Sequence, residues 1–93
     1  MEDKYGYVKL KSTLENIADK LNKEGYDDSA NEVLRASKFY GGMPSEFMGE
    51  SWLALRKVLA CKNELSSETF ELAESLCKEI KLGFERVGQK LPE

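Results

Sequence analysis

Apolar residues recur along this chain at spacings of three and four, which is the period of one face of an α-helix. The first such stripe consists of Tyr7, Leu10, Leu14, Ile17 and Leu21. It predicts a helix over about residues 5–24, because Gly25 then stands where a left-handed residue commonly ends a helix.

A second amphipathic segment begins after a very short connection. Asp27, Asp28 and Ser29 are residue types that cap helix N-termini, and Ser29 and Glu32 have the spacing of a capping box. We therefore expect a helix over about residues 29–40, antiparallel to the first. Its apolar face would comprise Ala30, Val33, Leu34, Ser37 and Tyr40, with Phe39 at the edge.

The segment Phe39-Tyr40-Gly41-Gly42-Met43-Pro44-Ser45 breaks this helical pattern. A pair of glycines and a proline stop a helix, whereas two aromatic side chains and a methionine are too apolar for a purely solvated loop. Either the core of the protein or a partner must cover these side chains, and the sequence leaves both possibilities open.

Two further helices are expected over about residues 46–62 and 67–87. The apolar face of the first comprises Trp52, Leu55, Val58 and Leu59, widened by Leu53 and Ala60. The second opens at Ser66 or Ser67, passes through Gly83, and has an apolar face formed by Phe70, Ala73, Leu76, Cys77, Ile80, Phe84 and Val87. Four amphipathic segments without an alternating strand predict one all-α domain over residues 1–93, a small bundle of about four helices.

The composition indicates a cytoplasmic protein. No apolar run approaches the roughly 20 residues that span a bilayer, and the N-terminus lacks the basic and apolar regions of a signal peptide. We therefore expect no membrane partner. In a reducing compartment Cys61 and Cys77 are expected to be small buried apolar side chains, with a disulfide as the lesser alternative.

The chain contains no histidine, which removes the commonest general base and the commonest transition-metal ligand. Two thiols alone cannot complete a four-ligand zinc site. The Gly41-Gly42 pair has neither the spacing nor the context of a phosphate-binding loop. We therefore expect no catalytic, cofactor-binding or metal-binding residues, and a protein that is not an enzyme.

The net charge of −3 is modest, but the acidic residues are segregated. Between Glu24 and Leu53 only Arg35 and Lys38 are basic, against Glu24, Asp27, Asp28, Glu32, Glu46 and Glu50. A second run without bases contains Glu64, Glu68, Glu71 and Glu74. Such runs disfavour nucleic-acid binding and favour a basic protein partner, although acids also stabilise helix starts and solvated faces.

An apolar side chain ringed by carboxylates suits recognition of a basic protein, because the apolar group gives desolvated contact and the acids steer association. Tyr26, Phe47 and Met48 could supply that apolar group, but each also suits the core of a small bundle. The predicted partner contacts are Glu24, Tyr26, Asp27, Asp28, Glu32, Glu46, Phe47 and Glu50.

The second predicted helix and the junction after it resemble a known family. Residues 30–36 (Ala-Asn-Glu-Val-Leu-Arg-Ala), followed by Phe39-Tyr40-Gly41-Gly42-Met43 and Ser45, are similar to small helical bacterial proteins with a Gly-Gly-Met-Gly-Ser turn after the second helix. The resemblance covers about residues 10–48; Pro44 replaces the family's glycine, and Glu46-Phe47 departs from its usual continuation. These domains are suspected immunity proteins of bacterial toxin systems. The resemblance therefore implies a cytoplasmic protein that neutralises a toxin domain, often a basic nuclease, by stoichiometric binding.

Two alternative functions fit the same sequence. A self-associating structural or regulatory protein would use the regular stripe from Phe70 to Val87 as the seam of a homodimer. A phage-encoded inhibitor of a host enzyme would use the same acidic binding surface as an immunity protein.

Overall fold

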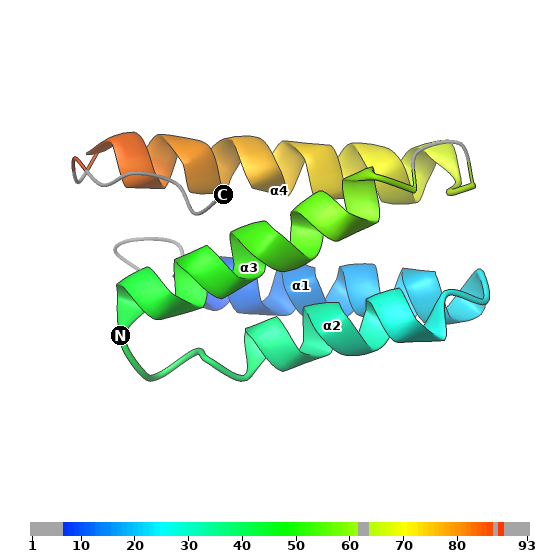
Figure 1. The fold of residues 1–93 in the computed structure, drawn as a ribbon, viewed down its shortest axis with the longest axis horizontal. Helices are drawn as coiled ribbons and strands as arrows, with labels where there is room; N and C mark the ends of the chain where they lie inside the picture. Colours follow the sequence, from blue (N-terminus) through cyan, green and yellow to red (C-terminus); the bar gives the residue numbers. More distant parts are fainter. Residues whose placement is uncertain (1–6, 62–63, 87, 89–93) are drawn as a thin grey trace.

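A computed structural model describes residues 7–61, 64–86 and 88 of the 93-residue chain. These residues form four helices and no strand: α1 (Tyr7–Lys23), α2 (Asp27–Ser37), α3 (Pro44–Leu59) and α4 (Ser67–Arg86) (Figure 1). The predicted small all-α bundle is confirmed. None of the helices in the described ranges is long and apolar enough to cross a membrane.

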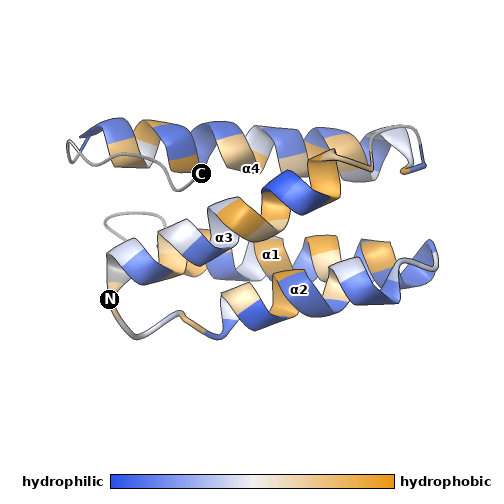
Figure 2. Ribbon diagram, in the orientation of Figure 1, coloured by the Kyte–Doolittle hydropathy of each residue, from blue (hydrophilic) through white to orange (hydrophobic). Residues whose placement is uncertain are grey.

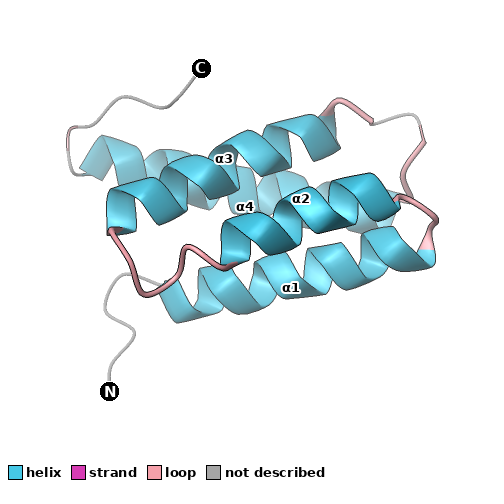
Figure 3. Ribbon diagram, turned by 60° about the horizontal axis from the view of Figure 1, so that its bottom comes forward, coloured by secondary structure: helices cyan, strands magenta, loops and turns pink. Residues whose placement is uncertain are grey.

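Each helix packs against its neighbours in chain order, and α4 returns to contact α1. Figures 1 and 3 show that consecutive helices run in opposite directions. The α1–α2 turn and the α3–α4 connection therefore meet at one end of the bundle, and the α2–α3 connection lies at the other end. This arrangement brings segments about 40 residues apart in sequence side by side.

Side chains from all four helices form one apolar core. Figure 2 shows hydrophobic and hydrophilic segments alternating along each helix, as expected when one face of a helix is buried. The largest fully buried apolar side chains are Leu14, Ile17, Leu21, Val33, Leu55, Val58 and Ile80. Every fully buried side-chain polar atom among the described residues has a hydrogen-bond partner.

The observed limits of α2 correct the prediction for this helix. It begins at Asp27, with Tyr26 at the N-cap position, and no side chain caps it. Ser29 lies inside the first turn, so the predicted capping box is wrong. Asp27 and Asp28 instead occupy the first turn, where negative side chains interact favourably with the helix dipole. The helix ends at Ser37, before the predicted end at Tyr40.

Some of the apolar side chains in and just after the junction that follows α2 lie in the core, and others are exposed to solvent. Gly41 has φ +96°, a backbone conformation that favours glycine, and α3 then starts at Pro44 with Met43 as its N-cap. Phe47 is only 2% exposed and meets the rings of Tyr7 and Tyr40 edge-on, with centroids 6.3 and 5.8 Å away. Met43 is 66% exposed. The protein's own core therefore covers Phe47, whereas solvent surrounds Met43.

The buried face of α3 is rotated from the predicted one, because α3 packs against both α2 and α4. Trp52, Leu53 and Leu59 are only partly buried, and Ala60 is exposed. The buried positions of this helix are Phe47, Gly49, Ser51, Ala54, Leu55 and Val58. Small residues at several of these positions allow the neighbouring helices to approach closely.

The stripe of α4 belongs to the core of the bundle. Its buried apolar residues are Ala73, Leu76, Cys77, Ile80 and Phe84, and Phe70 is partly buried. Val87 lies outside the described residues. The helix continues through Gly83 as predicted, and Met48 of α3 packs there: a Cβ on Gly83 would lie 2.6 Å from the Met48 Cε.

Candidate interaction surfaces

Glu24 joins the α1–α2 turn to the start of α4. Its carboxylate accepts hydrogen bonds from the Ser66 backbone N–H at 2.8 Å, from the Ser66 hydroxyl at 3.1 Å and from the Thr69 hydroxyl. The Ser66 hydroxyl oxygen also accepts the Thr69 backbone N–H at 3.3 Å, as an N-cap does. We call Glu24, Ser66 and Thr69 the Glu24 clasp. The hydrogen bonds from Thr69 and Ser66 lower the pKa of Glu24 below its ordinary value.

Tyr26 makes a second connection at the same end. Its hydroxyl donates a hydrogen bond to the Glu64 carbonyl oxygen at 2.7 Å, and its ring packs against the core. Partial burial raises the pKa of Tyr26, and the negative charges of Glu64 and Glu24 raise it further. Tyr26 and Glu24 therefore have structural roles within the protein, in addition to any contact with a partner.

The two acidic runs of the sequence meet at this end of the bundle. We define the acidic end as Glu24, Asp27, Asp28, Glu64 and Glu68. Lys20 forms an ion pair with Glu68, and Lys23 forms one with Asp19. Asp27 and Asp28 are exposed, and neither forms an ion pair with any other described residue. Their charges are therefore available to a partner.

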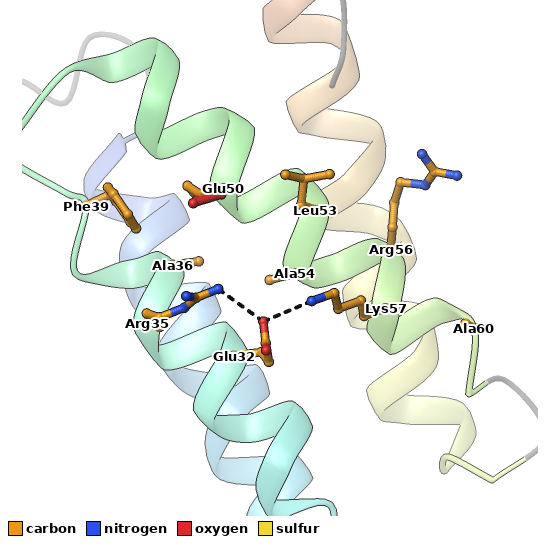
Figure 4. Close-up of a pocket in the computed structure, with 10 residues that line it drawn as sticks. All are labelled: Glu32, Arg35, Ala36, Phe39, Glu50, Leu53, Ala54, Arg56, Lys57 and Ala60. Carbon is orange, nitrogen blue, oxygen red and sulfur yellow. Dashed lines mark hydrogen bonds and ion pairs between the residues drawn. The ribbon is translucent and has the colours of Figure 1, made fainter. Parts of the chain in front are cut away.

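A groove of about 410 Å³ runs between α2 and α3 (Figure 4). The Glu32 carboxylate lies across it, 3.4 Å from Arg35 and 3.3 Å from the Lys57 ammonium of α3. We call it the α2–α3 groove, and its lining residues are Glu32, Arg35, Ala36, Phe39, Glu50, Leu53, Ala54, Arg56, Lys57 and Ala60.

The eight predicted contacts do not form one surface. Phe47 is a core residue, so its prediction as an exposed contact is wrong. Glu46 lies in the first turn of α3, at the end of the bundle opposite the acidic end. Glu32 and Glu50 line the α2–α3 groove. Glu24, Tyr26, Asp27 and Asp28 alone lie together at the acidic end.

Sequence reasoning missed two sets of charged residues. Glu64 and Glu68 were not grouped with the first acidic run, because about 40 residues separate the two runs. Arg56 and Lys57 lie just beyond the base-poor stretch, yet the antiparallel packing of α2 and α3 brings them to the groove that Glu32 lines. Because α2 and α3 are consecutive helices, the opposite charges of Glu32 and Lys57 could have predicted that these two side chains pair across the groove.

A second hollow and two free thiols lie outside these surfaces. A second hollow of about 440 Å³ lies between α1 and α4, and Met48 of α3 contributes to its lining. Cys61 and Cys77 are both free thiols, and burial raises the pKa of Cys77 to about 11. Within the described ranges, no three cysteine or carboxylate side chains are grouped so that they could hold a metal ion.

Known proteins add no support to any of these surfaces. Comparison of the chain with them found no matching family model, no matching curated protein and no matching solved structure. The resemblance to immunity proteins, which depends on the residues in and after α2, therefore stays a prediction.

Proposed function

We propose that this protein is an immunity protein that neutralises a basic toxin domain by stoichiometric binding. The observation that supports the proposal best is the meeting of two separate acidic runs at one end of the bundle. An excess of negative charge at one end of a protein attracts a basic partner over several ångströms and accelerates its association. A basic nuclease is the class of toxin that this surface fits best, because such an enzyme already binds a polyanion.

The backbone of the acidic end is held just before the exposed aspartates. Glu24 precedes them and is bonded to Ser66 and Thr69, and Tyr26 is bonded to the Glu64 carbonyl. Binding to Asp27 and Asp28 would therefore cost little backbone entropy, which favours affinity. Since neither aspartate has an ion pair to give up within the described chain, a partner's lysine or arginine replaces only water there.

Neutralisation of this kind requires no catalytic residue. Carboxylates at the acidic end would occupy the positions that substrate phosphates take in a nuclease, or would block the channel that leads to them. Binding energy from a few well-placed charges and from the surrounding apolar contacts is sufficient for such inhibition.

The test uses the product of the reading frame next to this gene as the candidate toxin. We expect this product to stop growth when expressed alone and to be harmless when this protein is co-expressed. The double variant Asp27→Lys/Asp28→Lys should weaken the purified complex about 100-fold at low salt, since each reversal turns an attraction into a repulsion. Glu46→Lys/Glu85→Lys is the matched control, because it makes the same change of net charge at two exposed positions outside the acidic end.

Two outcomes would count against the proposal at different levels. An adjacent product that neither stops growth nor binds this protein would overturn the function. A complex whose affinity is unchanged in the double variant would keep the function and overturn the acidic end as the binding surface. Glu50→Lys should leave the toxin affinity unchanged, because Glu50 lies in the α2–α3 groove.

A further inference from the structure

One strip of α3 carries opposite charges at its two ends. Glu50, Leu53, Ala54 and Lys57 are spaced at i, i+3, i+4 and i+7, so they share one face of the helix. All four line the α2–α3 groove, as Figure 4 shows. Leu53 is partly exposed, and Ala54 lies at the floor with 4% exposure. We call these four residues the α3 strip.

The charges of the α3 strip are complementary to those of a second α3 strip that runs in the opposite direction. When a second α3 is laid antiparallel on the first, each acidic end meets a basic end, and the apolar residues meet in the middle. A two-fold axis between Leu53 and Ala54 produces this arrangement and generates both charge pairs at once. From this we infer that a second copy of the chain docks in the α2–α3 groove, with Glu50 of each copy facing Lys57 of the other.

The residues of the strip are free to make these pairs. Glu50 forms no ion pair with another residue in the described part of the chain. Lys57 is paired with Glu32 at 3.3 Å, but its side chain is 65% exposed, and an exposed pair contributes little to stability. The Lys57 ammonium can therefore be shared between Glu32 and an incoming carboxylate.

The shape of the groove also fits a second helix. Ala36 of α2 and Ala54 of α3 supply small side chains at its floor, so a leucine from the other copy can approach the backbone of both helices. Phe39 closes the groove toward the end of α2. Apolar contact in the middle with charge pairs on either side is the usual anatomy of a protein interface. The acidic end takes no part in this dimer, so the inference does not depend on the proposed function.

The first experiment measures self-association by sedimentation equilibrium. The unmodified protein should form a dimer at about 100 µM, and Glu50→Lys or Lys57→Glu alone should weaken the dimer at least about tenfold, because each places like charges opposite one another. Glu85→Lys and Lys81→Glu make the same changes of net charge on exposed positions of α4 and should have no effect.

Mixing the two single variants decides the orientation. Glu50→Lys leaves lysines at both ends of the strip, and Lys57→Glu leaves glutamates at both ends, so the mixture should form a heterodimer that neither variant forms with itself. This result does not depend on the Glu32 pair that Lys57→Glu also removes. A monomer at every concentration, or a mixture that associates no better than its components, would overturn the inference.

A cross-link locates the two-fold axis. Leu53→Cys in a Cys61→Ser background places the only partly exposed thiol of the described chain close to the axis, since the remaining Cys77 is buried. Mild oxidation should then give a covalent dimer. Glu85→Cys in the same background is the control. Equal cross-linking of the two variants would place the interface elsewhere and refute the antiparallel α3 pairing.

Discussion

The Glu24 clasp allows a quantitative test of how the bundle is closed. The variant Glu24→Gln replaces the carboxylate that accepts hydrogen bonds from Ser66 and Thr69 with a neutral amide of nearly the same size. Hydrogen bonds to a charged group contribute about 1.5–3 kcal/mol, and hydrogen bonds between neutral groups such as the amide of Gln contribute about 0.5–1.5 kcal/mol. Because Glu24 is partly exposed, we expect the free energy of unfolding to fall by about 2 kcal/mol in total.

This loss should depend on pH in a defined direction. The hydrogen bonds lower the pKa of Glu24 in the folded protein below its ordinary value of 4.5, so folding favours the ionised form. The stabilisation is therefore complete above pH 4.5 and disappears as the pH falls through the lowered pKa. The difference between the unmodified protein and Glu24→Gln should be full at neutral pH and should shrink toward zero in acid.

Urea and thermal denaturation followed by circular dichroism measure both effects. In the thermal experiment at neutral pH the melting temperature of Glu24→Gln should be about 10 °C lower, since 1 kcal/mol corresponds to about 4–8 °C in a domain of this size. Glu15→Gln is the matched control, because the one ion pair of Glu15 with a described residue is an exposed pair with Lys11 on the same helix. If Glu24→Gln destabilises the protein no more than Glu15→Gln, or by the same amount at pH 7 and at about pH 3, the reasoning is refuted.

Three other predictions concern the core and the junction after α2. Phe47→Ala should reduce the free energy of unfolding by about 3–5 kcal/mol because Phe47 is 2% exposed, whereas Met43→Ala should change it by less than about 0.5 kcal/mol; equal effects in urea titrations would contradict the burial. Gly41→Ala should cost about 1–2 kcal/mol because the φ of Gly41 is +96°, and Gly42→Ala, whose φ is not positive, should cost clearly less in the same assay. Cys77 should resist alkylation at pH 8 until the protein is denatured, because burial raises its pKa to about 11; rapid modification detected by mass spectrometry in the native protein would argue against this environment.

Helical periodicity predicted the parts of the fold that each helix specifies by itself. The stripe that contains Leu14 and Ile17 is buried as expected, and so is the stripe of α4 that contains Ile80. The period of 3.6 residues places these side chains on one face whatever the helix packs against. For the same reason α4 could be followed through Gly83, since a single glycine costs only about 1 kcal/mol in a helix.

The predictions failed where contacts from distant parts of the chain decide the structure. Ser29 has the residue type and spacing of an N-cap, but the turn before α2 is held by Tyr26 on Glu64 and by Glu24 on Ser66, which are about 40 residues away. No local pattern encodes these contacts. The acidic end was missed for the same reason, since it consists of two runs that only the antiparallel topology brings together.

At the α1–α2 turn, substitutions of Asp27 and Asp28 should be tolerated better than substitutions of Glu24. Among the described residues, replacing Asp27 or Asp28 removes no side-chain hydrogen bond or ion pair to another helix, whereas replacing Glu24 opens the clasp to α4. If related chains face toxins that change over time, selection can alter the side chains at positions 27 and 28 at the cost of their interaction with the helix dipole, about 0.3–1 kcal/mol each. Position 24 should keep its carboxylate throughout. The bundle thus presents two exposed aspartates directly beside an anchored glutamate, an arrangement that permits new binding specificities to arise on an unchanged fold.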